Sequence, residues 1–147
     1  MTAEAQLAGF LAKFNPEIEA IAIAARAKMR ARLPGATELV YDNYNALAIA
    51  YGPGERTSEV VFSLALYPRW VSLFLKFKGL RDASNLLKGS GNTVRHIVLK
   101  DASTLDDPAV RELMDQAVKL HPIDATKKPG LIIKSIATKQ RPRRPAR

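Results

Sequence analysis

The stretch SEVVFSLALYPRWVSLFLKF, residues 58–77, decides the fold of this chain. It contains two runs, 58–67 and 70–77, in which apolar residues occupy both alternating faces. Such runs are typical of strands that are covered on both sides, or nearly so. The Tyr-Pro-Arg segment between the runs turns the chain. The two runs are therefore predicted to form the central antiparallel pair of a sheet.

The segments on either side of this pair predict further helices and strands. Asn15-Pro16 separates two helices, because asparagine can accept hydrogen bonds at a helix start and proline is preset for the first helical position. Asp107-Pro108 begins a last helix for the same reasons. The remaining predicted elements are helices over 3–14, 16–33 and, for one or two turns, 82–88, and strands over 37–42, 46–51 and 93–100.

The order of these elements indicates the fold class. Helices come first, a meander of strands follows, and a strand with a closing helix comes last. The strands do not alternate with full-length crossover helices, so a doubly wound parallel sheet is the weaker interpretation. We expect an α+β fold, with an antiparallel sheet of about five or six strands and helices packed mainly on one face, as in a two-layer sandwich.

The net charge of +9 is concentrated at one end of the chain. Eight of the 23 Lys and Arg residues, and none of the 14 Asp and Glu residues, lie in 127–147, so residues 1–126 are nearly neutral. We expect one compact domain over 1–126 and a basic C-terminal segment over 127–147. Within that segment, 131–137 is predicted as a strand and 138–147 as a flexible tail.

The composition excludes several classes of site. A chain of 147 residues without cysteine has no disulfide, zinc-thiolate site or thiol nucleophile. His96 and His121 are the only histidines and lack a metal-ligand spacing, so no metal or other cofactor is expected. There is no 18-residue apolar run and no basic start typical of a secretory signal, which leads us to expect a cytoplasmic protein without membrane association.

The segment KGSGN, residues 88–92, has two interpretations. It lacks the glycine spacing, the Lys-Ser/Thr pair and the following helix of a phosphate-binding loop. Gly89 as a helix stop and Gly91-Asn92 as a strand entry account for every residue, so a turn is the stronger prediction. Ser90 also lacks the final glycine of a nucleophile elbow.

Candidate ligand-binding residues come from the strand ends and from the strand over 93–100. Arg95 shares a face with apolar residues, and we expect it to need a structural ion pair or, alternatively, a ligand anion. Polar-tipped aromatic residues can line a small pocket, although they equally often close a core. If the domain binds a small molecule, we expect the site to lie between Tyr41, Asn43, Trp70 and Arg95.

Two groups of basic residues are candidates for binding anions. Arg26, Lys28, Arg30 and Arg32 follow one another on the second helix, where a solvated face is the commoner explanation. The candidate polyanion-binding residues of the tail are Lys139, Arg141, Arg143, Arg144 and Arg147. These residues have no aromatic neighbour within the tail for base stacking, so sequence-specific recognition of nucleic acid is not implied. The apolar run 131–137 is expected to pair within this chain or with a partner subunit's edge, which would make a homodimer.

Three stretches resemble the YdhG-like domain family, a set of small bacterial domains without an established general function. They are LPGATELVYDNYNALAI (33–49), LYPRWVSLFLKF (66–77) and NLLKGSGNTVRHIVLKDASTLDDPAVRELMDQAV (85–118). Within the third stretch, the run LLKGSGNTVRHIVL (86–99) is the most specific part. The resemblance spans about residues 16–121 and implies a fold similar in outline to frataxin. Some relatives are labelled iron chaperones by that similarity, but the acidic ridge used by frataxin is reduced here to Glu17 and Glu19. No iron ligand or catalytic residue is therefore carried over.

These observations lead to a primary functional hypothesis and two alternatives. The primary hypothesis is a non-enzymatic cytoplasmic ligand-binding or accessory domain, whose partner is an unknown small molecule or protein. The first alternative is association with nucleic acid or another polyanion through the basic tail. The second is an uncharacterised small-molecule enzyme that uses the region of Tyr41, Trp70 and Arg95.

Overall fold

The computed structural model describes residues 1–146 and shows an α+β fold with a six-stranded sheet. The strand order is β5-β4-β3-β2-β1-β6, and only the pair of β1 and β6 is parallel. The strands are β1 (Thr37–Asp42), β2 (Leu47–Gly52), β3 (Phe62–Leu66), β4 (Val71–Lys76), β5 (Val94–Leu99) and β6 (Gly130–Ile136). The predicted antiparallel pairing of 58–67 with 70–77 is confirmed for β3 and β4, which lie inside the sheet. The first part of the predicted strand is wrong, because Thr57–Glu59 form a short 3-10 helix and β3 begins only at Phe62.

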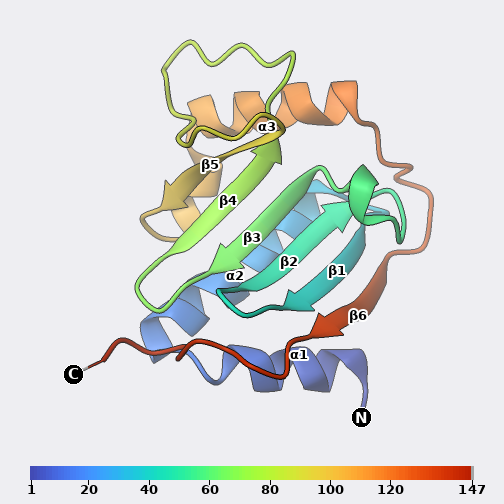
Figure 1. The fold of residues 1–147 in the computed structure, drawn as a ribbon. Coiled ribbons are helices and arrows are strands. Elements are labelled where there is room, and N and C mark those ends of the chain that lie inside the picture. The colour runs from blue at the N-terminus through green and yellow to red at the C-terminus, as the bar shows by residue number, and fades with distance from the viewer. Residues whose placement is uncertain (147) are drawn as a thin grey trace.

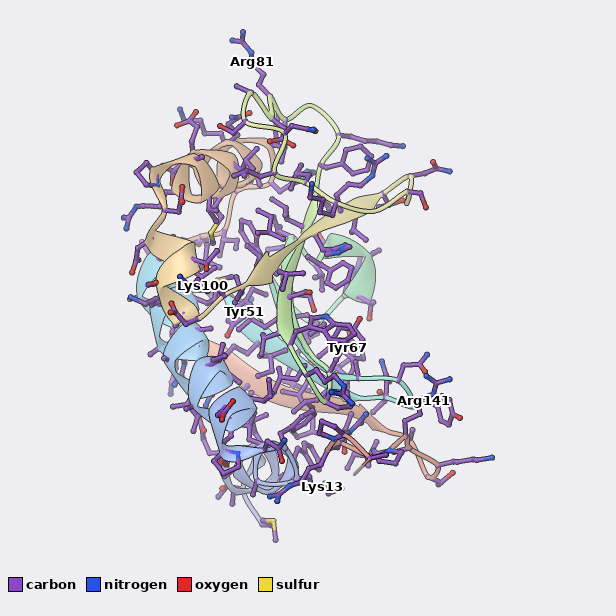
Figure 2. All side chains as sticks on the ribbon, turned by 90° about the vertical axis from the view of Figure 1, so that its left-hand side faces the viewer. Lys13, Tyr51, Tyr67, Arg81, Lys100 and Arg141 are labelled. Carbon is purple, nitrogen blue, oxygen red and sulfur yellow. The ribbon has the colours of Figure 1, made fainter. Side chains whose placement is uncertain are left out.

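Three helices cover one face of this sheet: α1 (Ala3–Leu11), α2 (Pro16–Arg32) and α3 (Pro108–Leu120). Helix α2 crosses behind the sheet in Figure 1, with α1 at its lower end and α3 at its upper end. Figure 2 shows the sheet from the side, with the helices gathered on one side of it. The predicted two-layer arrangement is confirmed.

The core lies between the sheet and α2. Ala22, Ala25 and Met29 of α2 are fully buried, and the two small alanines allow the helix to lie close to the strands. Each large apolar side chain buried here contributes on the order of 1.5–3 kcal/mol to folding. The strand residues that face the helices and are fully buried include Val40, Ile49, Leu64, Leu66, Val71 and Leu73.

Both predicted helix starts are confirmed, since Pro16 and Pro108 occupy the first positions of α2 and α3. The Asp107 carboxylate accepts a hydrogen bond from the N–H of Ala109 at 3.0 Å. Asn15 stands at the start of α2 without a capping hydrogen bond from its side chain, so the proline alone marks that boundary.

The structure differs from the prediction at residues 82–88, which form no helix. The Asp82 carboxylate accepts from the N–H groups of Leu86 and Leu87, both at 2.9 Å, and thereby closes a turn. Asn85 in this turn has a positive φ of 54°, which a continuing right-handed helix does not allow. Gly89 has a φ of 107°, a conformation that favours glycine, but it follows no helix, so its predicted role as a helix stop is wrong.

For residues 131–137, the sequence left open whether the predicted strand pairs within this chain or with a partner subunit. Strand β6 pairs with β1 of the same chain, from Thr37↔Gly130 to Asp42↔Ile136, rather than with another subunit. The chain leaves α3, passes along the upper right of the molecule in Figure 1 and enters the sheet at the edge beside β1. After β6 it continues along α1, below the turns that join β1 to β2 and β3 to β4 (Figure 1).

Candidate functional site

Residues 138–146, here called the C-terminal segment, are docked against the domain, which corrects the prediction of a flexible tail for this part of the chain. The Arg143 side chain is only 5% exposed, and its Nη2 atom donates to Asp42 Oδ1 at 2.9 Å and to the Asn43 carbonyl at 2.6 Å. Asp42 ends β1 with its side chain 1% exposed. A buried carboxylate needs a cation, and Arg143 supplies it.

Further contacts hold the C-terminal segment on both sides of Arg143. The Gln140 side-chain amide donates to the Asp42 carbonyl at 3.1 Å, and the Arg141 N–H donates to the Tyr44 carbonyl at 2.9 Å. The Arg144 Nε donates to the Lys13 carbonyl at 3.1 Å. The segment is therefore fixed by backbone groups of α1's end and of the β1–β2 turn, in addition to the buried ion pair.

The docked C-terminal segment forms one wall of a groove of about 730 Å³. The turn between β3 and β4 forms the other wall, and the β1–β2 turn contributes Asn45. We call this the aromatic–arginine groove, and its lining residues are Asn45, Tyr67, Pro68, Arg69, Trp70, Arg141, Pro142, Arg144, Pro145 and Ala146. Its volume lies within the range of about 300–1,000 Å³ that is typical of ligand pockets.

An aromatic pair lies in the wall formed by the β3–β4 turn. The rings of Tyr67 and Trp70 stack with their centroids 4.7 Å apart and an interplanar angle of 21°. The Tyr67 N–H donates to the Trp70 carbonyl at 2.9 Å, which holds the two residues at the base of the turn. Trp70 nevertheless remains 42% exposed. Figure 2 shows Tyr67 close to Arg141 of the C-terminal segment, on the side of the molecule away from the helices.

The groove is positively charged. Three exposed arginines line it, Arg69, Arg141 and Arg144, and within residues 1–146 none of them forms an ion pair. No Asp or Glu is among the described residues that line the groove. The Arg141 guanidinium lies 5.6 Å from the centre of the Tyr44 ring, which orients it at the groove's rim. The arginines are thus available to an anionic ligand.

The basic run on α2 is ion-paired. The prediction of a solvated face is wrong for Arg26 and Arg32, whose side chains are 13% and 14% exposed, whereas Lys28 and Arg30 remain 35% and 50% exposed. Arg26 binds both Glu4 and Glu38 at 2.7–2.9 Å. Arg30 also lies near these two carboxylates, at 3.6 and 3.2 Å. Lys28 and Arg32 are paired with Asp106 at 2.6 and 3.1 Å. Neighbouring elements bring carboxylates to this face, so its charges stabilise the fold.

Glu38 and Tyr51 form a buried polar pair that was not predicted from the sequence. The Tyr51 hydroxyl donates to Glu38 Oε2 at 2.7 Å, and Arg26 donates to both carboxylate oxygens at 2.9 and 3.0 Å. The pair adjoins a second cavity of about 460 Å³ at the end of α2. The sequence feature that could have indicated this pair is Glu38 itself, an acidic residue at a strand position that faces the core. Because Glu38 is already fully paired with this chain's own donors, the pair serves packing rather than ligand binding.

Burial of Tyr51, together with the charge of Glu38, raises the pKa of its hydroxyl well above the usual value of 10.0. The unfolded chain releases this proton near pH 10 whereas the folded protein retains it, so stability must fall as pH rises above 10. We expect Tyr51→Phe to lose less stability than the parent protein between about pH 9 and pH 11. Urea unfolding at both pH values measures this difference. Equal losses in the two proteins would show that Tyr51 does not titrate in this way.

The four residues predicted to surround a small-molecule site do not come together. Tyr41 lies on β1, where its hydroxyl is 2.6 Å from Thr57 Oγ1. Asn43 follows β1 in the turn, and Trp70 lies in the aromatic–arginine groove. Arg95 is on β5, four strands away from β1, which at about 4.8 Å per strand is roughly 19 Å.

The ion pair predicted for Arg95 is absent from the described residues. Its Nε donates to the Gly91 carbonyl at 2.9 Å, and its guanidinium lies 4.3 Å from the centre of the Phe77 ring. A carbonyl and an aromatic face satisfy this half-buried cation at the sheet edge without a carboxylate.

Residues from two separately predicted sets meet in the groove instead. Trp70 was predicted to bind a small molecule, and Arg141 and Arg144 were predicted to bind a polyanion. Lys139 is exposed in the same segment, outside the groove lining, and Arg143 anchors the segment. Arg147 lies outside the described residues.

Among residues 1–146, no three side chains of His, Asp or Glu gather where they could hold a metal ion. None of the helices described here combines the length and apolar character needed to cross a bilayer. No protein-family model matches the chain, and neither a curated protein nor a solved structure matches it. The groove must therefore be interpreted from its own chemistry.

Proposed function

We propose that this protein is a cytoplasmic nucleic-acid-binding protein that holds its ligand in the aromatic–arginine groove. The observation that carries the proposal is the convergence of three arginines without ion partners on an exposed aromatic pair. Guanidinium groups bind phosphate oxygens through paired N–H donors, and aromatic rings bind bases. This combination differs from binding by a free basic tail, because the C-terminal segment provides a fixed wall.

The docked position of the C-terminal segment favours binding. A free tail loses conformational freedom when it binds, and that cost weakens the complex. Here Arg143 and the backbone contacts already hold Arg141 and Arg144 in place. The ligand therefore meets a preformed charged wall, and more of the phosphate interaction is available as binding free energy.

The lining supports binding rather than catalysis. Among its described residues there is no His, Asp, Glu, Lys or Cys. Arginine stays protonated at any physiological pH, so it cannot exchange protons with a substrate. Positive charge, the Asn45 amide, the Tyr67 hydroxyl and aromatic surface remain, and these groups can recognise a ligand through ion pairs, hydrogen bonds and stacking.

The groove arginines are tested by a pair of double variants. Arg69→Ala with Arg141→Ala removes two groove charges and leaves the Arg143 anchor intact. We expect binding of a labelled 12-nucleotide strand at low salt to weaken by about 10-fold or more. The slope of log K against log salt should become shallower by about 0.7 for each phosphate that the variant no longer neutralises. Fluorescence anisotropy at several salt concentrations measures both quantities.

The matched control removes two arginines elsewhere. Arg56→Ala with Arg81→Ala lowers the net charge equally at exposed positions outside the groove; the Arg56 side chain is 83% exposed. This control should bind nearly as well as the parent protein. An equal loss in both double variants would mean that net charge alone attracts the strand, and the proposal would be wrong. Failure of the parent protein to bind strand or duplex at low salt would also overturn it.

A further inference from the structure

We infer that the ligand of the aromatic–arginine groove is a single-stranded nucleic acid, with one base stacked on Trp70. This inference rests on the proposed function and adds to it the form of nucleic acid that the groove selects. Phosphate charge is common to single strands, duplexes and inorganic polyphosphate. The rest of the groove distinguishes among them.

The first distinguishing feature is the exposed indole. Tyr67 covers part of the Trp70 ring by stacking, and 42% of Trp70 remains exposed in the groove wall. An exposed aromatic surface of this kind binds the flat face of an unpaired base. The bases of a duplex are stacked on one another and present only their edges in the grooves. Trp70 therefore has a partner in a single strand and none in an intact duplex.

The second feature is the shape of the walls. Two turns and an extended segment form the groove, and within residues 1–146 no helix projects from it. Insertion of a helix or of a two-stranded ribbon into the major groove is the usual way to read a duplex. A recess of about 730 Å³ has instead the size of a pocket for a small ligand. A base with its sugar and phosphate fits such a recess, whereas a duplex has to stay outside it.

The third feature is the placement of charge around the ring. Arg69 precedes Trp70 in the β3–β4 turn, and Arg141 and Arg144 come from the opposite wall. A strand whose base rests on Trp70 thus has guanidinium groups on both sides for the phosphates that flank the base. Polyphosphate can contact the same arginines, but it gains nothing from Trp70.

The intrinsic fluorescence of the protein tests this inference directly, because Trp70 is the only tryptophan in the chain. The full-length protein is titrated with a 12-nucleotide thymidylate strand, a 12-base-pair duplex and polyphosphate at equal phosphate concentration. We expect the strand to quench the tryptophan emission and to bind about 10-fold more tightly than the duplex. The duplex and polyphosphate should leave the emission almost unchanged.

Substitution of Trp70 separates stacking from charge. Trp70→Ala should weaken binding of a labelled thymidylate strand by about 5- to 150-fold, the range typical of alanine substitution at stacking aromatics. Trp70→Phe keeps a ring and should lose less. The salt slope should stay unchanged in both variants, because the arginines that neutralise the phosphates remain. Val98→Ala, which removes an exposed apolar side chain on β5, is the control and should bind as the parent does.

Each outcome has a separate meaning. Equal or tighter binding of the duplex, or tight binding of the strand without quenching and without an effect of Trp70→Ala, overturns the single-strand inference and leaves the proposed function standing. Tighter binding of polyphosphate than of the strand assigns the groove to phosphate chains and overturns the inference. No binding of any nucleic acid overturns the proposed function, and the inference with it. Thermal unfolding of each variant checks that the fold is retained.

Discussion

Arg143→Ala is expected to destabilise the protein by about 3–5 kcal/mol, because it leaves the buried Asp42 carboxylate without its cation. The two side chains are 5% and 1% exposed and 2.9 Å apart. The pair is imperfect, since Asp42 Oδ2 and Arg143 Nε lack hydrogen-bond partners within residues 1–146. The stability lost in Arg143→Ala therefore reflects mainly the cost of leaving the Asp42 carboxylate buried and unpaired. The net contribution of the ion pair to stability is smaller than this loss. Urea unfolding at neutral pH gives the free energy of unfolding.

Two further variants make this expectation specific. Lys139→Ala removes an exposed charge from the same segment and should change stability by less than about 0.5 kcal/mol. Asp42→Ala combined with Arg143→Ala leaves no unpaired charge and should lose less stability than the two single variants together. If the groove binds nucleic acid as proposed, Arg143→Ala should also weaken that binding, because the C-terminal segment that carries Arg141 and Arg144 is no longer held against the domain. A variant as stable as the parent would show that the C-terminal segment is not anchored by Arg143.

Arg26→Ala is expected to cost about 3 kcal/mol, the second largest effect. Arg26 joins the N-terminal helix to the sheet, because it binds Glu4 of α1 and Glu38 of β1 at once. Its loss leaves Glu38 buried, with Tyr51 and the more distant Arg30 as remaining partners. These partners place the expected cost at the lower end of the range for broken buried pairs, about 3–5 kcal/mol.

Lys28→Ala on the same helix is the matched control for Arg26→Ala. Lys28 pairs with Asp106 at a surface site where the two side chains are 35% and 41% exposed, so the cost should stay below about 1 kcal/mol. Arg26→Lys keeps the charge but loses the planar guanidinium that reaches two carboxylates. Its loss of stability should therefore lie between the losses expected for Arg26→Ala and Lys28→Ala. Similar losses for Arg26→Ala and Lys28→Ala would contradict a special role for the buried pair.

Local pattern predicted most of the elements because its causes are local. Alternation of apolar residues over 58–77 specified β3 and β4, and proline after an N-cap residue specified the starts of α2 and α3. The failure at 82–88 is also local in origin. Asp82 can cap a helix or close a turn with the same carboxylate, and the positive φ of Asn85 selects the turn.

The candidate site was predicted only in pieces. The exposed aromatic residue and the arginines were identified, but Trp70 was grouped with Arg95, which lies on β5 and far from β1. Position along a strand gives the face on which a side chain lies and does not give the strand's place in the sheet. The order β5-β4-β3-β2-β1-β6 put Arg95 and Tyr41 far apart.

By itself, the sequence determined most of the helices and strands, their buried faces and the concentration of positive charge at the C-terminal end, because each depends on neighbours a few residues away. Only the tertiary structure decided which charges are used in folding and which remain available. Arg143 meets Asp42 across 101 residues, while Arg141 and Arg144 stay exposed beside Trp70. The physical reason is that a charge is satisfied by whatever the fold brings within about 3–4 Å of it, and no local pattern encodes that distance.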